Sequence, residues 1–214
     1  GNCGAAAATT GLDYLVTYDA NTATSGVTPS NSLVAMTGGS LTLPTNSGNL
    51  AKTNYTFAGW NTAANGSGTS YTVGATTFIP SGDTTLYAQW NSTITYSGNG
   101  SNSGSVPTAT TARGTAGNTT LSNAGTMART GYSFVGWNTQ ADGLGTDYAS
   151  GLATYASTGD TTLYAKWTRT ITYNSNGANS GAPSKTTDVF LNAATPTIST
   201  FPTVNTMVRT GYTF

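Results

Sequence analysis

Histidine and glutamate are both missing from the 214-residue sequence, and charged residues make up only 7% of it. An ordinary globular domain carries about 25% charged residues. The lack of histidine removes the commonest general base and the commonest zinc ligand, and the lack of glutamate leaves aspartate as the only carboxylate side chain. We therefore expect neither an enzyme nor a metalloprotein, and we expect no cofactor.

Lysine and arginine are also scarce, and they are never clustered. Seven of them balance seven acidic residues, so the formal net charge is zero. Nucleic-acid binding depends on clustered positive charge, so no nucleic-acid partner is expected. No apolar run approaches about 18 residues, the length that a membrane-spanning helix needs, and no membrane span is predicted. The basic residues stand singly, at Lys52, Arg113, Arg129, Lys166, Arg169, Lys185 and Arg209.

Cysteine occurs once, at Cys3, which excludes an internal disulfide framework and a thiolate-clustered metal site. We interpret Cys3 as an exposed thiol near the terminus, with pairing between chains or lipid attachment as alternatives. A loop with Asp142 and Asp147 has the oxygen ligands of a weak calcium site. Asn65 and Ser70 replace these acids one repeat earlier, so a shared structural ion is not predicted.

Paired carboxylates would have to come from Asp83 and Asp160, each followed by Thr-Thr. An aspartic protease needs Asp-Thr-Gly or Asp-Ser-Gly, but Thr85 and Thr162 occupy the Gly position. The two aspartates also lie in different repeats. We interpret them as turn caps, and we predict no catalytic residue.

The sequence repeats itself with a period of 77 residues. Residues 55–62 (YTFAGWNT) return as 132–139 (YSFVGWNT), and residues 83–90 (DTTLYAQW) return as 160–167 (DTTLYAKW). The tripeptide Val/Ile-Thr-Tyr occurs three times, at residues 16–18, 94–96 and 171–173, and marks the start of three units. The period predicts an N-terminal segment, two full units and a partial third unit, with the bounds 1–13, 14–90, 91–167 and 168–214.

The partial third unit reads as part of a longer array of such units. An alternative is a subunit whose unfinished sheet is completed by a strand from a neighbouring copy. In that case residues 1–13 are the candidate for the donated strand, and the partners are neighbouring repeats or like subunits in a homopolymer.

Periodicity within a unit is that of β-strands, so the predicted fold class is mostly β, in tandem small modules. In residues 86–90, Leu86, Ala88 and Trp90 share one face, while Tyr87 and Gln89 share the other. No apolar stripe with a helical period runs from residue 107 to 132, where we expect strands and loops with at most one turn of helix.

Tryptophan is the predicted centre of each small core. Gly59 and Gly136 each precede a Trp, which indicates close backbone approach or a positive φ. Burying an aromatic side chain contributes about 2 to 3 kcal/mol, a large share of the stability of a module this size. The predicted core anchors are Gly59, Trp60, Trp90, Gly136, Trp137 and Trp167.

The motifs GYSFVGW (131–137), GTDY (145–148) and LYAKW (163–167), with their counterparts in residues 55–90, resemble the Listeria–Bacteroides repeat. That family is related to the internalin B-repeat and occurs in tandem on bacterial surface proteins. The resemblance covers residues 14–214 and implies a β-grasp-like sheet in each unit and a stalk or adhesive array outside the cell.

Two departures from the family pattern stand out. The stretch between the first strand and the Gly-Tyr-x-Phe block is longer than usual, so an extra hairpin or strand is expected there. Asn54 replaces the Gly before Tyr55, so the turn of the first unit is expected to differ.

Two functional hypotheses follow. The first is a non-catalytic extracellular stalk, adhesin array or filament subunit, whose Thr, Ser and Asn surface stays hydrated without charge. The second is a module that binds surface glycans, with Tyr87 and Tyr164 on the outer face of the last strand as sugar-stacking residues.

Overall fold

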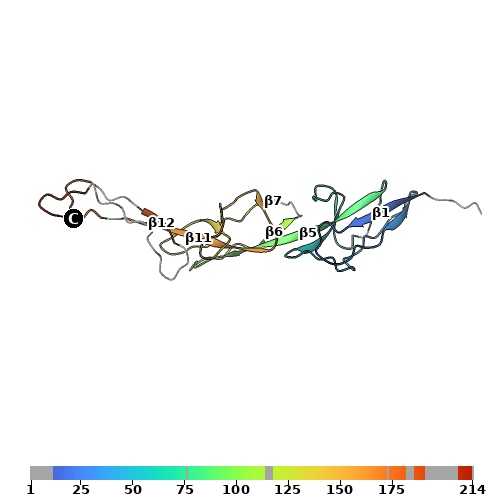
Figure 1. Cartoon of the computed structure of the whole chain (residues 1–214), viewed down its shortest axis with the longest axis horizontal. Coiled ribbons are helices and arrows are strands. Elements are labelled where there is room, and N and C mark those ends of the chain that lie inside the picture. The colour runs from blue at the N-terminus through green and yellow to red at the C-terminus, as the bar shows by residue number, and fades with distance from the viewer. Residues whose placement is uncertain are drawn as a thin grey trace, which may run out of the picture. The chain divides into compact units, whose positions relative to one another are not determined.

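The computed structural model describes residues 12–75, 77–113, 118–172, 174–181 and 207–213, together with the backbone of 186–190. These residues form strands and turns and include no helix (Figure 1). Cys3 and most of the segment proposed as a donated strand lie outside the described residues. The strands are β1 Asp13–Asp19, β2 Ser32–Ala35, β3 Thr56–Asn61, β4 Ser70–Tyr71, β5 Thr84–Ser97, β6 Thr110–Arg113, β7 Asn118–Thr119, β8 Ser133–Asn138, β9 Asp147–Tyr148, β10 Tyr155–Ala156, β11 Thr161–Ile171 and β12 Thr186–Phe190.

Contacts divide the chain into two compact units. The first holds the chain up to Thr93 together with Thr111–Thr119 and Ala156–Asp160, and the second holds the remainder. Strand β5 therefore contributes its residues up to Thr93 to the first unit and those from Ile94 onward to the second.

In the first unit the strands lie in the order β2-β1-β5-β3-β4. β1 pairs antiparallel with β2 and parallel with β5, in the register Val16 to Thr84. β3 pairs antiparallel with both β5 and β4. The first and last long strands of the repeat are thus direct neighbours with the same direction.

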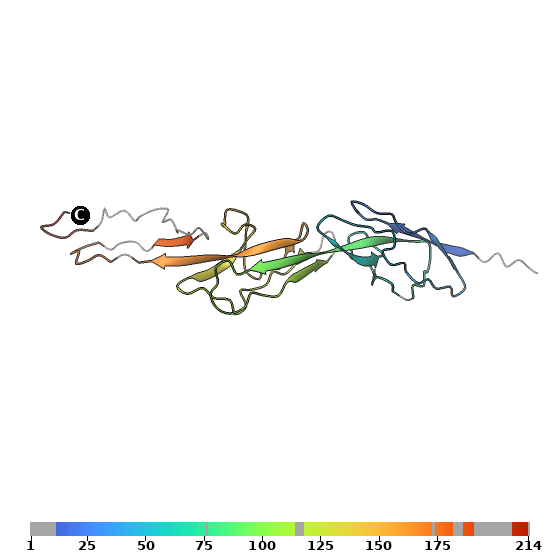
Figure 2. The same cartoon turned by 90° about the horizontal axis from the view of Figure 1, so that it is seen from below.

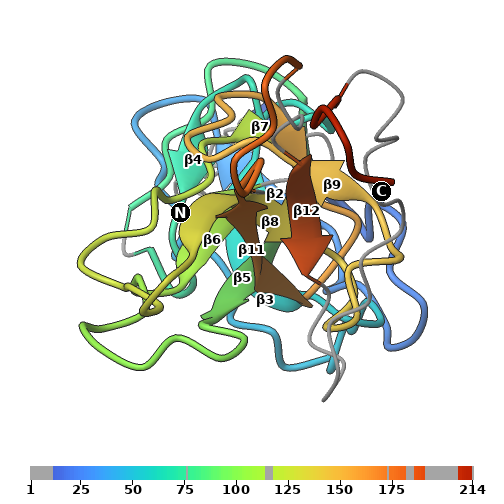
Figure 3. The ribbon, with the colours of Figure 1, turned by 90° about the vertical axis from the view of Figure 1, so that its left-hand side faces the viewer.

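The second repeat of the sequence has the same arrangement. The end of β5 pairs parallel with β11, in the register Ile94 to Thr161, and β8 pairs antiparallel with β11 and β9. β6 pairs with β5, and β12 lies antiparallel beside the end of β11 (Figures 2 and 3). β7 and β10 form a separate two-stranded sheet.

The predicted fold class, mostly β with tandem modules, is confirmed. The β-grasp part of the expectation is not confirmed, because the described residues provide no helix to cross the sheet. The long connection contains a strand in both repeats, β2 in the first repeat and β6 in the second repeat.

Alternation along β5 follows the sequence pattern. Leu86, Ala88 and Trp90 are fully buried, and Tyr87 is half-buried. Gln89, expected on an outer face, is only 8% exposed. The cause is the loop that follows β3, because the Gln89 side-chain amide donates to the carbonyl of Ala63 in that loop (3.4 Å).

The turn before Tyr55 keeps the left-handed residue and the backbone hydrogen bond of its counterpart, and it differs by an isolated bridge between Lys52 and Tyr55. Asn54 has a φ of 62° and Gly131 a φ of 79°. In both units the Tyr N–H donates to the carbonyl three residues earlier at 3.0 Å. Asn replaces Gly here because it tolerates the left-handed region better than other residues with a side chain.

The described parts of the third repeat have the same local pairing as the first two. The hairpin of β11 and β12 repeats that of β1 and β2. An isolated bridge joins the chain at the same place each time, as Ser25 to Ala51, Ser103 to Ala128 and Ser180 to Val208.

Candidate functional site

All four tryptophans are buried, with at most 2% of each side chain exposed. Each indole N–H donates to a carbonyl of its own unit. Trp60 donates to Pro44 (3.1 Å), and its counterpart Trp137 donates to Ser122 (2.8 Å). The remaining two donate from Trp90 to Asn21 (2.9 Å) and from Trp167 to Gly98 (3.0 Å). The indoles therefore fix loops as well as filling cores.

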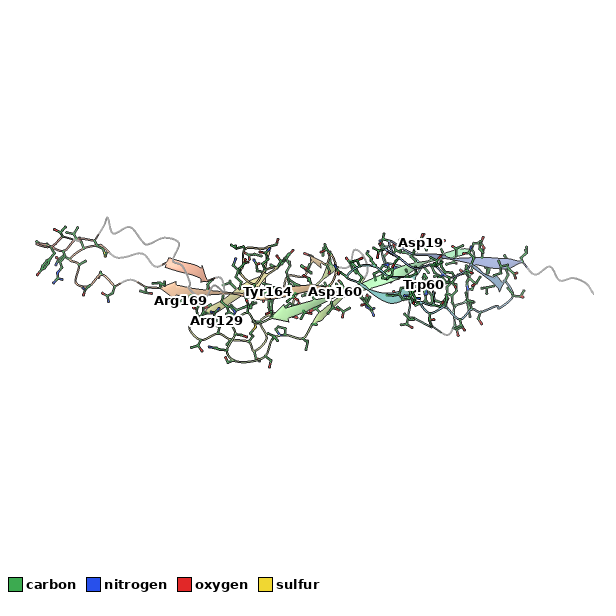
Figure 4. All side chains as sticks on the ribbon, turned by 60° about the horizontal axis from the view of Figure 1, so that its bottom comes forward. Asp19, Trp60, Arg129, Asp160, Tyr164 and Arg169 are labelled. Carbon is green, nitrogen blue, oxygen red and sulfur yellow. The ribbon has the colours of Figure 1, made fainter. Side chains whose placement is uncertain are left out.

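Aromatic packing around the indoles is also duplicated. Phe57 contacts Trp60 and Trp90 edge-on, with ring centroids 5.4 and 5.7 Å apart. Phe134 contacts Trp137 and Trp167 at 5.0 and 5.7 Å. A Tyr of the first strand completes each cluster, Tyr18 on Trp60 and Tyr96 on Trp137. Trp60, labelled in Figure 4, thus lies in surroundings like those of Trp137.

The two predicted glycines mark a β-bulge. The register of β3 against β5 shifts between Phe57 and Gly59, and that of β8 against β11 shifts at the same place. Gly59 has a φ of 115° and Gly136 a φ of 143°. A Cβ on Gly59 would lie 2.2 Å from the carbonyl oxygen of Tyr71, so only glycine fits.

A buried asparagine after Trp60 and after Trp137 organises the following loop, and the sequence analysis did not single it out. The Asn61 amide donates to the carbonyls of Gly66 and Gly68 (both 3.2 Å), while its Oδ1 accepts from two backbone N–H groups. Asn138 makes the equivalent bonds to Gly143 and Gly145. The repeated Gly-Trp-Asn-Thr motif was the available signal.

Asn138 also explains why the loop with Asp142 and Asp147 is unsuited to calcium. The carbonyls of Gly143 and Gly145 and the Asp147 carboxylate all accept from the one Asn138 amide nitrogen. An amide nitrogen therefore stands where a cation would have to lie. Among the described residues no group of three His, Cys, Asp or Glu side chains is placed to hold a metal.

Asp83 and Asp160 serve the same role in each repeat. The Leu15 N–H donates to Asp83 Oδ1 (2.8 Å), and the Thr93 N–H donates to Asp160 Oδ1 (2.7 Å). Each aspartate thereby ties the start of the last strand of its repeat to the first strand. The two carboxylates act separately and structurally.

Lys166 on β11 forms an ion pair with Asp147 on β9 in the second unit. Partial burial acts to raise the pKa of Asp147, but hydrogen bonds from Lys166 and Asn138 and the positive charge of Lys166 outweigh it and hold the pKa below its usual value. The first unit carries Gln89 and Ser70 at these positions, so the pair is particular to the second unit.

The second unit is expected to lose stability in acid. Because the Asp147 pKa is lower in the folded than in the unfolded chain, its contribution is present at neutral pH and is lost as the pH falls below about 4. The loss is at most about 1 kcal/mol, since Asp147 is 57% exposed. Urea titrations at pH 7 and pH 3 measure it. The D147S/K166Q variant, which copies the first unit, is expected to lose less between the two pH values; an equal loss contradicts this assignment.

A cation lies over an aromatic ring at the same turn in all three repeats. Lys52 stands 4.5 Å from the centre of the Tyr55 ring, Arg129 4.2 Å from that of Tyr132, and Arg209 4.4 Å from that of Tyr212. Such contacts are worth about 0.5 to 1 kcal/mol at exposed sites. They account for the placement of three of the seven basic residues.

Tyr87 and Tyr164, predicted as sugar-stacking residues, lie on central strands and are half-buried. Tyr87 is the strand partner of both Asp19 and Asn61. Tyr164, which Figure 4 labels, is the strand partner of Ser97 and Asn138. Their role in glycan binding stays a prediction.

Comparison with known proteins gives the family. The model of the Listeria-Bacteroides repeat domain matches residues 14–89 and again residues 93–166. The chain belongs to this family. The Listeria–Bacteroides repeat thus accounts for the repetition found in the sequence.

Two relatives of this repeat protein occur in Evansella cellulosilytica. One, named "Putative Gly-rich membrane protein", is 34% identical over 176 residues, and the other, named "Putative membrane protein", is 38% identical over 94 residues. The matches cover 78% and 42% of this chain but only 20% and 14% of those proteins. No solved structure matches. Within the described residues, no helix is both long and apolar enough to span a bilayer.

Proposed function

We propose that the chain is a non-catalytic, load-bearing spacer of a bacterial surface protein. The observation that carries this proposal is the parallel pairing of the first and last strands of each repeat, β1 with β5 and β5 with β11. Membership of a repeat family often found on the cell surface and relatives named as membrane proteins support the location.

Strand direction determines how a tandem module resists stretching. Tension along the chain pulls the start of β1 and the far end of the β5 segment in opposite directions. Because the two strands are parallel neighbours, this force slides one along the other and loads all of their hydrogen bonds together. Antiparallel neighbours pulled in this way would instead open one bond at a time.

Side-chain hydrogen bonds reinforce the pairing of β1 with β5 near the start of β1, where the pulling force is applied. Asp83 holds the N–H of Leu15 just before the first paired residues, and the hydroxyls of Thr17 and Thr85 lie 2.9 Å apart across the strands. In the second repeat Asp160 holds the N–H of Thr93 in the same way. These bonds would break together with the backbone bonds.

Stretching of single molecules tests this proposal. When the chain is pulled from its ends, each repeat is expected to unfold in a separate high-force event. Each event should release a chain that spans roughly 250 Å when extended. Unfolding under force reports the barrier of the loaded pathway, so it depends on the pulling direction.

The control changes only the direction of pulling. In a Cys3→Ser background, handles are attached through Asp13→Cys and Gly82→Cys, next to the starts of β1 and β5. Because the two strands are parallel, both handles lie at the same end of the strand pair. This geometry peels the strands apart bond by bond, so the first unit is expected to open at a clearly lower force. Equal forces in the two directions would contradict a load-bearing role.

A further inference from the structure

The same surface cavity occurs in both units, beside the bulge that follows the Gly-Tyr-x-Phe block. Its volume is about 220 Å³ in the first unit and about 440 Å³ in the second. All described lining residues of the first belong to that unit. They include Ala58, Ser70, Thr72, Gln89, Asn91 and, from β6, Arg113.

The backbone creates this cavity. The bulge places Ala58 opposite no residue of β5, and Gly59 lets the short strand β4 approach without a side chain in between. Tyr71 on β4 forms one wall and Gln89 on β5 another. The shape thus follows from features shared by the repeats, whereas the polar side chains around it differ.

In the first unit those side chains suit a sugar ring. Gln89 and Asn91 carry amides, and Ser70 and Thr72 carry hydroxyls. Amides and hydroxyls both donate and accept, so they match ring hydroxyl groups. The Gln89 amide nitrogen donates to the carbonyls of Ala63 and Tyr87, so its oxygen, which lies beside Gly66, is the atom that accepts from a ligand.

Arg113 adds a positive charge at the edge of this cavity, and no carboxylate stands among the described residues that line it. A guanidinium pairs with a carboxylate through two parallel hydrogen bonds. The lining therefore matches a ligand that has both hydroxyl groups and a carboxylate.

The second unit lacks this chemistry at the equivalent place. Lys166 replaces Gln89 and Asp147 replaces Ser70, and the two neutralise each other in an ion pair. Val135, 48% exposed, replaces Ala58. The second unit is thus an internal control with the same backbone.

We propose that the cavity of the first unit binds a uronic-acid residue of an acidic polysaccharide. Arg113 pairs with the carboxylate, and Gln89 and Asn91 bond ring hydroxyl groups. This site is independent of the spacer role, since force measurements on the unliganded chain do not involve it.

Titration of the full chain with tetragalacturonate, followed by NMR, tests the proposal. Shifts are expected in the first unit only, with weak affinity that a neutral galactose tetrasaccharide does not reproduce. Arg113→Gln is expected to weaken binding at least tenfold, whereas Lys166→Gln, which removes the same charge from the other cavity, should leave it within twofold.

A double variant that carries the side chains of the second unit is expected to lose the binding site while the first unit stays folded. S70D/Q89K gives the first unit the ion pair that the second unit already accommodates, and it is expected to abolish binding while the circular dichroism spectrum stays unchanged. Equal binding of the neutral sugar, an equal loss in Lys166→Gln, or no shift at about 10 mM tetragalacturonate would overturn the proposal.

Discussion

Trp137→Ala is expected to unfold the second unit at room temperature while the first stays folded. Trp137 is fully buried, contacts Tyr96 and Phe134, and holds the Ser122 carbonyl through its indole N–H. Truncating a buried Trp costs about 3 to 5 kcal/mol, and a module of this size has little more than that in total. The variant should therefore show one denaturant transition with roughly half the parent amplitude.

Trp60→Ala is the matched variant, because Trp60 makes the same contacts in the first unit. It should remove the other transition. Near-ultraviolet circular dichroism during a urea titration measures both. A parent-like titration curve for either variant would refute the role of these residues as core anchors.

Gly59→Ala is expected to destabilise the first unit by about 2 to 4 kcal/mol. Gly59 has a φ of 115°, which strains any residue with a side chain, and the added methyl group would meet the Tyr71 carbonyl oxygen at 2.2 Å. Since that oxygen belongs to the backbone of β4, relief requires the strand to move. The same change at Gly136 should act on the second unit.

Gly82→Ala provides the control. A Cβ at Gly82 has no atom within 4 Å, and its φ lies outside the left-handed region. The expected change is within about 0.5 kcal/mol. Equal effects at Gly59 and Gly82, measured by the same urea titrations, would show that the bulge does not depend on glycine.

Features that depend on residues close together in the sequence could be predicted. Alternation of Leu86, Ala88 and Trp90 with polar residues predicted a strand with one buried face, and the structure has it. The 77-residue period located both repeats. The positive φ of Gly59 and Gly136 followed from a small residue placed between a strand and a Trp.

Features that depend on distant partners were not predicted. The Asp83 carboxylate holds a backbone N–H 68 residues away, and the sequence showed only a turn residue before a strand. Burial of Gln89 depends on a loop that reaches over the outer face of β5. The parallel direction of β1 and β5 likewise arises from the path of the chain between them, which strand periodicity alone does not determine.

Hydrogen exchange of Trp137→Ala, followed by mass spectrometry, tests the central claim that two Trp-centred modules fold on their own cores. If they do, amides of β8 and β11 lose protection in this variant, while those of β3 and the first half of β5 exchange as slowly as in the parent chain. Loss of protection across both sets would mean that the repeats share one core, which contradicts the claim.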